Sequence, residues 1–473
     1  MRSASKVDVI YGDMERIVSK EYLSTAIFDR IKTALDPFPY ELEKEQIPYI
    51  VVMPGSKEEI SEIVKYANTS KIPLFLRGSG THLAGAARPY THGIFINMHR
   101  FNKMEFLEDY GFFECGSGCI CAQVQEELEK RDYFLPMSPG SRLSATMGGL
   151  IANNTSTHII DTSIGKPGDY VYGLEVVLPN GEIIETGTMG LRRPAGTDLT
   201  KFFLGGDGLL GIITKIRMRL LPSVQKAYGV AVFDNLGSLA KGVQRMYRER
   251  RPPPLFMEFM DQKSATIGYE IKEMKPPEGP VVFFVSIGNT EEEASNKTLQ
   301  ILRSFQAERP IEASEVDDLD MWDKLWSAGE VIGSFLMQKD GSQMSVAEVV
   351  STLKNLPECM EEVQHFNRGL PILGQLELYL FGHIGALALH PGVLIPRQWD
   401  NEKKRKAIKE RFQREAELNL KYGTCGGEWG QFSKRTSFFI QRYGRVSYDL
   451  IKGLKNVFDP NNILNPGVLE GYG

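Results

Sequence analysis

This chain has little cysteine, no long apolar run and no large excess of one charge. Five cysteines in 473 residues are too few and too odd in number for a disulfide framework, and favour a reducing compartment. The start, M-R-S-A-S-K-V-D, is too polar for the apolar segment of a secretory signal. Lys and Arg number 55 against 60 Asp and Glu, with no basic stripe, which gives no reason to expect a nucleic-acid partner. We therefore expect a cytoplasmic protein.

One stretch, residues 378–396, carries no formally charged side chain. It contains two histidines, three glycines and two prolines, and this composition suits a folded core better than a membrane-spanning helix. The sequence leaves open a peripheral association with a membrane surface.

Glycine-rich segments are the feature that the chain does have. An apolar run, Ile72–Leu76, reads as a buried strand, and the turn R-G-S-G-T-H-L-A-G follows it from Arg77. Glycine lets a backbone turn tightly and approach a ligand, and successive N–H groups in such a turn can bind an anion. Taken alone, this pattern is explained more simply by a strand followed by a loop with no ligand. Two further glycine-rich segments, 139–154 and 205–211, favour a dinucleotide site.

Apolar spacing predicts the elements around these turns. Ser56 and Glu59 have the form of a capping box, and apolar residues at helical spacing continue to Ala67. Residues 212–220 alternate, which predicts a half-buried strand with its polar face made by Lys215, Arg217 and Arg219. Charged amphipathic helices are predicted over 291–305 and 401–420, and a C-terminal helix over 448–458. A chain of this length holds two or three domains, and we expect a new domain after residue 222.

The three glycine segments, in this order, resemble those of the flavin-linked oxidases of the vanillyl-alcohol-oxidase type, whose FAD domain is also called PCMH-type. R-G-S-G-T at 77–81, P-G-S at 139–141 and G-G-D-G-L-L-G-I-I-T at 205–214 carry the resemblance. It implies an α+β fold, with a PCMH-type FAD-binding domain of two parts and a cap domain built on an antiparallel sheet flanked by helices. A nicotinamide-binding Rossmann domain is disfavoured, because no G-x-G-x-x-G follows the first strand. The implied division is an N-terminal arm (1–46), an FAD-binding domain (47–223), a cap or substrate domain (224–425) and a C-terminal segment that closes the active site (426–473).

The resemblance implies FAD as cofactor. Some families attach flavin to a loop histidine at the position of Thr81, one residue before His82, so we expect non-covalent FAD here. The residues implied to bind FAD lie in the three glycine segments: Arg77, Gly78, Ser79, Gly80, Thr81, Leu83, Pro139, Gly140, Ser141, Thr146, Gly148, Gly149, Asn153, Gly206, Asp207, Gly208, Gly211, Ile212 and Ile213.

Within this superfamily, the chain is most similar to the D-lactate, glycolate and D-2-hydroxyglutarate dehydrogenases. Their F-G-H-x-G-D-G-N-x-H reads F-G-H-I-G-A-L-A-L-H here, and their G-E-H-G reads G-E-W-G. The metal ligands implied at matching positions are His383, His390 and Glu428, a set that suits Zn, Mn or Fe. Because residues seven apart on a regular strand face opposite sides, a shared metal requires the chain to bend near Gly385.

Several positions depart from that group. Its catalytic histidine is replaced by Trp429, which cannot act as a base and is expected to form a wall of the substrate pocket. The arginine expected three residues after a tryptophan is absent after Trp326. A phenol-oxidising branch of the superfamily is the alternative resemblance, in which Arg435 and Tyr443 would stabilise a phenolate.

The sequence thus predicts an FAD-dependent oxidoreductase that takes a hydride from a hydroxyl-bearing carbon, with a 2-hydroxy acid as the expected substrate class. The alternatives are an oxidase or dehydrogenase of para-substituted phenols, and an FAD-carrying electron-transfer subunit. Flavin would supply the redox chemistry, while the protein orients the reactants. Expected partners are an electron acceptor, such as an iron–sulfur subunit, an electron-transfer flavoprotein or a quinone, and further copies of the same chain.

Overall fold

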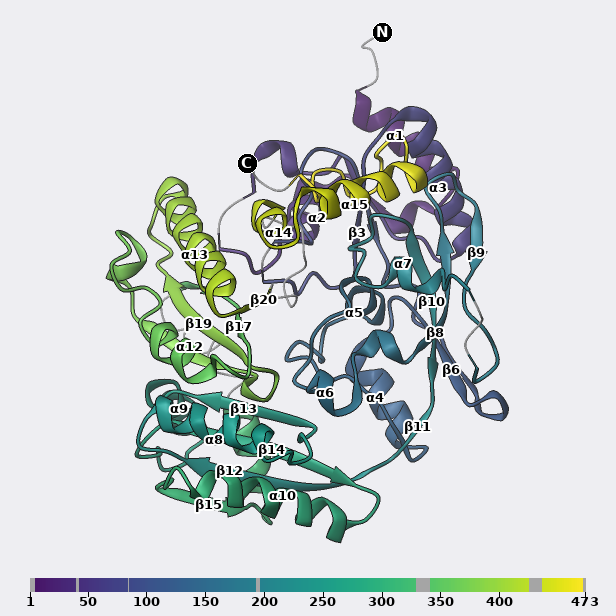
Figure 1. Cartoon of the computed structure of the whole chain (residues 1–473). Coiled ribbons are helices and arrows are strands. Elements are labelled where there is room, and N and C mark those ends of the chain that lie inside the picture. The colour runs from purple at the N-terminus through teal and green to yellow at the C-terminus, as the bar shows by residue number, and fades with distance from the viewer. Residues whose placement is uncertain are drawn as a thin grey trace. The chain divides into compact units, whose positions relative to one another are not determined.

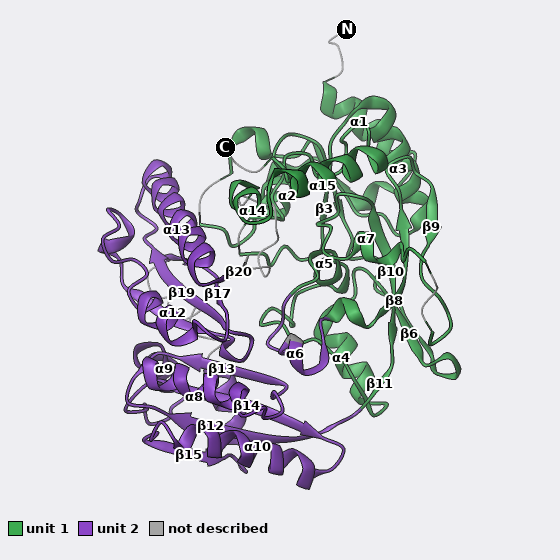
Figure 2. Ribbon diagram, viewed as in Figure 1, with its two compact units in different colours: residues 1–155, 167–222, 427–473 green, residues 156–166, 223–426 purple. Residues whose placement is uncertain are grey.

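The computed structural model describes residues 5–39, 42–83, 85–192, 196–328, 341–424 and 436–470. Two compact units divide the chain, as Figures 1 and 2 show. Unit 1 comprises residues 1–155, 167–222 and 427–473, and unit 2 comprises residues 156–166 and 223–426. Each unit is therefore discontinuous in sequence. In the part of the chain that is described, no helix is long and apolar enough to cross a membrane.

The first layer of unit 1 is a small mixed sheet with the strand order β1-β2-β4-β3. Strand β4 lies between β2 and β3 and is parallel to both. Helix α3 begins at the predicted N-cap, since the Ser56 side chain accepts from Glu59 N. The Glu59 carboxylate accepts from Gly55 N, one residue before the position that a capping box uses. The bounds are β1 (Leu23–Ser24), β2 (Ile50–Val52), β3 (Leu74–Arg77), β4 (Ile94–Asn97), α1 (Lys6–Glu15), α2 (Ile27–Ala34) and α3 (Lys57–Ser70).

The second layer of unit 1 is an antiparallel sheet with the strand order β5-β6-β10-β8-β9. Its central strand β10 is half buried and alternates as predicted, with Ile216 and Met218 fully buried. The elements are β5 (Met104–Leu107), β6 (Phe112–Gly116), β8 (Val171–Val177), β9 (Ile183–Glu185), β10 (Ile212–Arg219), α4 (Cys121–Glu129), α5 (Met147–Asn153) and α7 (Thr200–Phe203), with the short pair β7 (Tyr133–Phe134) and β11 (Leu221–Pro222).

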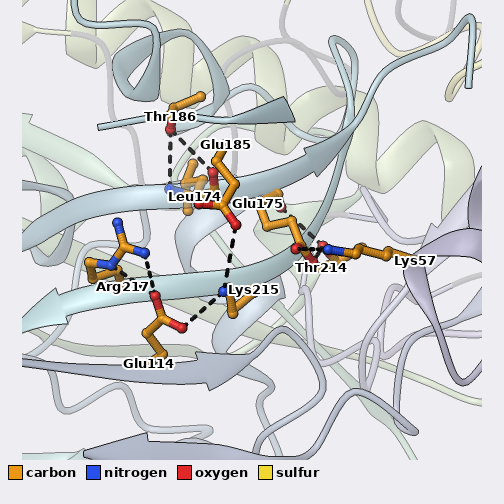
Figure 3. A network of polar contacts seen from close by, with 9 residues as sticks. All are labelled: Lys57, Glu114, Leu174, Glu175, Glu185, Thr186, Thr214, Lys215 and Arg217. Carbon is orange, nitrogen blue, oxygen red and sulfur yellow. Dashed lines mark hydrogen bonds and ion pairs between the residues drawn. The ribbon is translucent and has the colours of Figure 1, made fainter. Parts of the chain in front are cut away.

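The polar face of β10 carries ion pairs that extend across the sheet (Figure 3). Glu114 on β6 receives Arg217 Nε at 2.8 Å and Lys215 Nζ at 2.9 Å. Farther along, the Glu175 carboxylate accepts from Lys57 Nζ and Thr214 Oγ1, each at 2.7 Å. These contacts tie β10 to the strand on either side of it and to helix α3.

The C-terminal part returns to unit 1 and completes its core. Helices α14 (Thr436–Tyr443) and α15 (Arg445–Phe458) are followed by a segment in which Leu464 forms a bridge to Leu74 of β3. The buried Lys455 amino group donates to Asp459, to Leu209 O at 2.9 Å and to Leu464 O at 2.8 Å. Residues separated by almost the whole chain therefore share one core in unit 1.

Unit 2 is built on a large antiparallel sheet with the strand order β15-β12-β14-β13-β18-β19-β17-β20, and with β16 paired to β19. Helices α8, α10 and α12 contribute to one apolar core on this sheet. These findings confirm the α+β class and a cap sheet flanked by helices. The bounds are β12 (Gln225–Val232), β13 (Phe256–Met260), β14 (Val281–Gly288), β15 (Glu312–Glu315), β16 (Gln343–Val346), β17 (Val349–Ser351), β18 (Leu378–Gly382), β19 (Ala388–Ile395), β20 (Gly423–Thr424), α6 (Asp161–Ile164), α8 (Leu236–Arg248), α9 (Gln262–Ile271), α10 (Glu291–Gln306), α12 (Leu356–Val363) and α13 (Asn401–Tyr422).

Candidate functional site

The first two glycine segments meet in unit 1. Ser79, in the turn after β3, donates its hydroxyl to the Ser144 carbonyl in the loop before α5. A Cβ on Gly78 would lie 1.9 Å from Thr146 Oγ1, the N-cap of α5. The absence of a side chain at Gly78 therefore lets the two loops approach each other closely.

The third glycine segment lies at the other end of α5. Asp207 N donates to Ala152 O at 2.9 Å, and Asn465 Nδ2 donates to Asp207 O at 2.9 Å. Gly208 has φ +69°, in the left-handed region, and a Cβ there would lie 2.7 Å from Asn465 Nδ2. Burial raises the pKa of the Asp207 carboxyl to about 7. A carboxyl that is protonated much of the time repels a neighbouring phosphate less than an ionised one does.

Gly148 lets the start of α5 pack closely against Ser117. A Cβ on Gly148 would lie 2.5 Å from the Ser117 Cβ, and Gly148 N donates to Ser117 O at 2.8 Å. Ser117 Oγ is buried and has no hydrogen-bond partner in the described part of the chain. Arg77, in contrast, donates to Leu35 O at 2.6 Å and to Ser79 O at 3.2 Å. Its guanidinium therefore holds the loop backbone through these two carbonyls, and its role in binding FAD stays a prediction.

The other residues implied to bind FAD lie on or next to the same loops. Ile212 and Ile213 are buried in β10, and Asn153 ends α5 with its amide nitrogen 3.2 Å from Thr155 Oγ1. Leu83 is 38% exposed in the first loop. Gly80 and Thr81 lie in the first loop, and Gly149 lies in the first turn of α5. The remaining positions lie in the loops that precede α5 and β10: Pro139, Gly140, Ser141, Gly206 and Gly211.

In unit 2, the bend required between the two motif histidines is present. Strand β18 ends at Gly382, a 3-10 turn covers Ile384–Ala386, and β19 begins at Ala388. This hairpin brings the ring centroids of His383 and His390 to 4.9 Å from each other. His390 Nδ1 lies 3.1 Å from Ala347 O. Because a carbonyl only accepts, His390 donates from Nδ1, and its Nε2 carries the lone pair in the neutral ring.

Glu258, which the sequence analysis did not select, lies opposite His383. Strands β13 and β18 pair Phe259 with Gly382, and the same antiparallel register places Glu258 against His383. Both Glu258 carboxylate oxygens lie 2.8 Å from His383 Nδ1. Odd-numbered residues of β13 belong to the apolar core of unit 2, so Glu258 projects from the opposite face of the sheet.

A second histidine contacts the same carboxylate. It lies in residues 156–166, which belong to unit 2 although unit 1 sequence flanks them. His158 Nδ1 lies 3.2 Å from Glu258 Oε1, and the His158 ring centroid is 4.9 Å from that of His383. The nitrogen and carboxylate donor atoms of His158, Glu258 and His383 all lie within 4.8 Å of one another. Trp326 closes one side, with its ring centroid 4.6 Å from that of His158.

The two imidazoles determine the charge of Glu258. Burial by itself raises the pKa of the Glu258 carboxyl, but charge and hydrogen bonds from His383 and His158 outweigh it and hold the pKa at about 2. Glu258 is therefore ionised at neutral pH, at 7% exposure. A buried carboxylate of this kind requires compensating positive charge.

Three residues of the sequence-based site lie outside the described part of the chain: Glu428, Trp429 and Arg435. Their roles stay predictions, as does the ligand set that combines Glu428 with His383 and His390. Tyr443 is the last residue of α14 and is 47% exposed, and its ring is tilted by 44° to that of Phe439, with ring centroids 4.9 Å apart.

Comparison with known families assigns both parts of the chain. A family described as FAD binding domain matches residues 48–187, which defines the protein as an FAD-binding flavoprotein. A second, described as FAD linked oxidases, C-terminal domain, matches residues 222–469, more than half of the chain. The chain belongs to the FAD-linked oxidase family, and it is an FAD-linked oxidoreductase.

Relatives and solved structures agree with this assignment. D-lactate dehydrogenase of Archaeoglobus fulgidus is 28% identical over 429 residues, covering 89% of this chain and 90% of that protein. Glycolate oxidase subunit GlcD of Bacillus subtilis is 27% identical over 443 residues, covering 89% of each. The crystal structure of p-cresol methylhydroxylase with substrate bound has a TM-score of 0.78 at 16% identity, covering 99% of this chain and 98% of that chain. This confirms the PCMH-type fold.

Proposed function

We propose that this protein oxidises a 2-hydroxy acid to the 2-oxo acid. The hydride from the hydroxyl-bearing carbon passes to FAD, and the hydroxyl proton is released. The two electrons then pass to a separate acceptor, such as an iron–sulfur subunit, an electron-transfer flavoprotein or a quinone. Flavin is the hydride acceptor in this chemistry, and the protein's part is to bind and orient the substrate.

The observation that carries this proposal is the buried histidine and carboxylate cluster of unit 2. Imidazole and carboxylate groups are the ligands that Zn, Mn and Fe accept. A cation near His383 would attract the carboxylate of a 2-hydroxy acid and lower the pKa of its hydroxyl. The relatives support the substrate class, since one is named a D-lactate dehydrogenase and another a subunit of glycolate oxidase.

Anaerobic reduction of the bound flavin tests the proposal. Purified protein is mixed with D- and L-2-hydroxy acids or with 4-alkylphenols, each with and without a chelator, and the oxidised flavin band is followed. We expect a 2-hydroxy acid to bleach the flavin, the chelator to slow this at least tenfold, and His383→Ala to have the same effect, because one lost polar catalytic contact costs about 10²–10³ in rate.

Two results would contradict the proposal. Bleaching by a phenol, regardless of the chelator, would move the chemistry to the phenol-oxidising alternative and to Arg435. A flavin that no small molecule reduces, but that a partner protein does, would identify an electron-transfer subunit.

A further inference from the structure

Glu258 is a buried carboxyl group, 7% exposed, in contact with two imidazoles. Its carboxylate contacts His383 at 2.8 Å and His158 at 3.2 Å. Neutral imidazoles can donate hydrogen bonds to a carboxylate, but they bring no net positive charge. Burying a carboxylate without a compensating positive charge is unfavourable. The cluster therefore needs a cation, and either a bound metal or an additional proton can provide it.

The donor atoms favour a metal. Two imidazole nitrogens and one carboxylate oxygen form the set found in catalytic zinc sites and in non-haem iron sites. Ligands about 2.1 Å from a tetrahedral zinc lie about 3.4 Å apart. The carboxylate-to-imidazole contacts of 2.8 and 3.2 Å, with all three donors within 4.8 Å of one another, need only small shifts to surround one ion.

His158 is held firmly enough to act as a ligand. The next residues anchor it to unit 2, since Ile159 bridges to Phe256 and Ile160 N donates to Leu255 O at 2.8 Å. The Ile160 side chain is 1% exposed in the unit 2 core. His158 Nε2 is itself buried, with no hydrogen-bond partner among the described residues. An imidazole placed beside a carboxylate by such anchoring is preorganised for coordination.

We propose that His158, Glu258 and His383 together bind one divalent transition-metal ion. In this set, His158 and Glu258 take the places that the family motif would give to His390 and Glu428. The catalytic role of the site rests on the proposed function, because the ion would lie where the substrate oxygens are expected. The presence of the metal can be tested without the proposed function, because metal content is measured on the resting protein.

Zinc is the probe. Full-length protein is stripped with a chelator, dialysed against Zn²⁺ and analysed for zinc and flavin per chain. We expect one zinc per chain in the wild type. His158→Ala and Glu258→Gln are each expected to weaken zinc binding by more than tenfold, because even residues that only orient a ligand cost 10–100-fold. His365→Ala, which removes an exposed histidine from the same unit, is the matched control and should keep the zinc.

Two further variants separate this set from the motif set. If Glu428→Gln and His390→Ala lose zinc while His158→Ala keeps wild-type affinity, the proposal is overturned and the motif residues hold the ion. If the wild type binds no zinc, the cluster is bridged by a proton, and the proposal is also overturned. Bleaching of the flavin by a 2-hydroxy acid is a separate readout from zinc content, so failure of this ligand set and failure of the proposed substrate class are distinguishable.

Cobalt substitution keeps the test decisive if Glu258→Gln does not fold, which its flavin content and thermal unfolding would reveal. The visible absorption of bound Co²⁺ responds to the number and kind of ligands. We expect His158→Ala to change or abolish this spectrum. An identical spectrum in the wild type and in His158→Ala would exclude His158 as a ligand.

Discussion

At the scale of single residues, the close approach of the first two glycine segments requires that residue 78 has no side chain. Its Cβ would overlap Thr146 Oγ1 at 1.9 Å, and the Thr146 Cβ would be only 3.1 Å away. Thr146 is 2% exposed and caps α5 by accepting from Gly149 N. It cannot move aside without losing the cap or opening the gap between the two loops.

We therefore expect Gly78→Ala to weaken FAD binding by at least tenfold, which corresponds to about 1.4 kcal/mol. The flavin-to-protein ratio after purification and a titration of the stripped protein with FAD would measure this. Gly12→Ala is the control, since Gly12 lies within α1 and a Cβ there has nothing within 4 Å. The control should keep its flavin and gain roughly 0.5–1 kcal/mol of stability. Equal flavin content in the two variants would contradict the role given to Gly78.

The sequence carried part of the candidate site. His383 and His390 could be selected because they stand in one short motif, and the structure brings their rings together. Glu258 and His158 lie 100 residues or more from that motif, and no local spacing connects them to it. One signal was present, a single carboxylate in the apolar run L-F-M-E-F-M at 255–260. That Glu258 belongs to the site could be inferred only from the pairing of β13 with β18, which places Glu258 opposite His383.

At the scale of elements, strand β10 is stabilised by charges on its polar face. Glu114 is 9% exposed on its side chain and pairs with Arg217, which is 12% exposed, and with Lys215. Glu114→Gln would leave the Arg217 guanidinium with a weaker partner, and breaking such a pair costs about 3 kcal/mol. We expect a loss of this size in the free energy of unfolding, measured by chemical denaturation.

Glu185→Gln is the matched control for that prediction. Glu185 also contacts Lys215, at 3.9 Å, but its side chain is 60% exposed. Surface pairs of this kind contribute about 0–1 kcal/mol, so little change is expected. Similar losses in both variants would show that burial does not set the strength of this network.

The same pair predicts a dependence on acid. Burial raises the pKa of the Glu114 carboxyl, but hydrogen bonds from Lys215 and Arg217 outweigh it, so the pKa lies below its usual value of 4.5. The unfolded chain then binds the proton more readily, and the contribution of Glu114 is present above pH 4.5 and is lost as the pH falls through the lowered pKa. Wild type and Glu114→Gln should thus converge in stability on acidification. A constant difference between pH 7 and pH 3 would refute this.

Strand β10 also shows what sequence alone can predict at this scale. Alternation marked it as half buried and identified its polar face, because the period of a strand is local information. The partners on that face could not be named, since β6 precedes β10 by about a hundred residues and only the sheet order makes them neighbours. The same limit applies to segment 156–166, which joins unit 2 although it is flanked by unit 1 sequence.

At the scale of the whole molecule, Lys455 connects the last helix to the third glycine segment of unit 1. It is 3% exposed and donates to Asp459, Leu209 O and Leu464 O. Lys455→Met would leave Asp459, which is 1% exposed, without its cation. Removing one member of a buried pair costs about 3–5 kcal/mol, and we expect that loss in unfolding free energy together with loss of flavin.

Lys452→Met provides the control on the same helix. The Lys452 amino group lies 5.7 Å from the Tyr448 ring centroid, a contact that contributes at most about 1 kcal/mol. Its flavin content should stay at the wild-type level. If Lys455→Met behaves like this control, the C-terminal segment does not hold unit 1 together through Lys455.

The return of the chain end to β3 affects how the protein is made. Strand β3 is the last strand in the order of its sheet, and Leu464 bridges to it at Leu74. During synthesis at about 5–20 residues per second, roughly 10–50 s separate the release of residue 222 from that of Leu464. For that interval the nascent sheet has an open edge, which is a template for unwanted pairing. The order of translation thus makes unit 1 the first part begun and the last part finished, and a ribosome that stalls in unit 2 leaves an incomplete flavin domain behind.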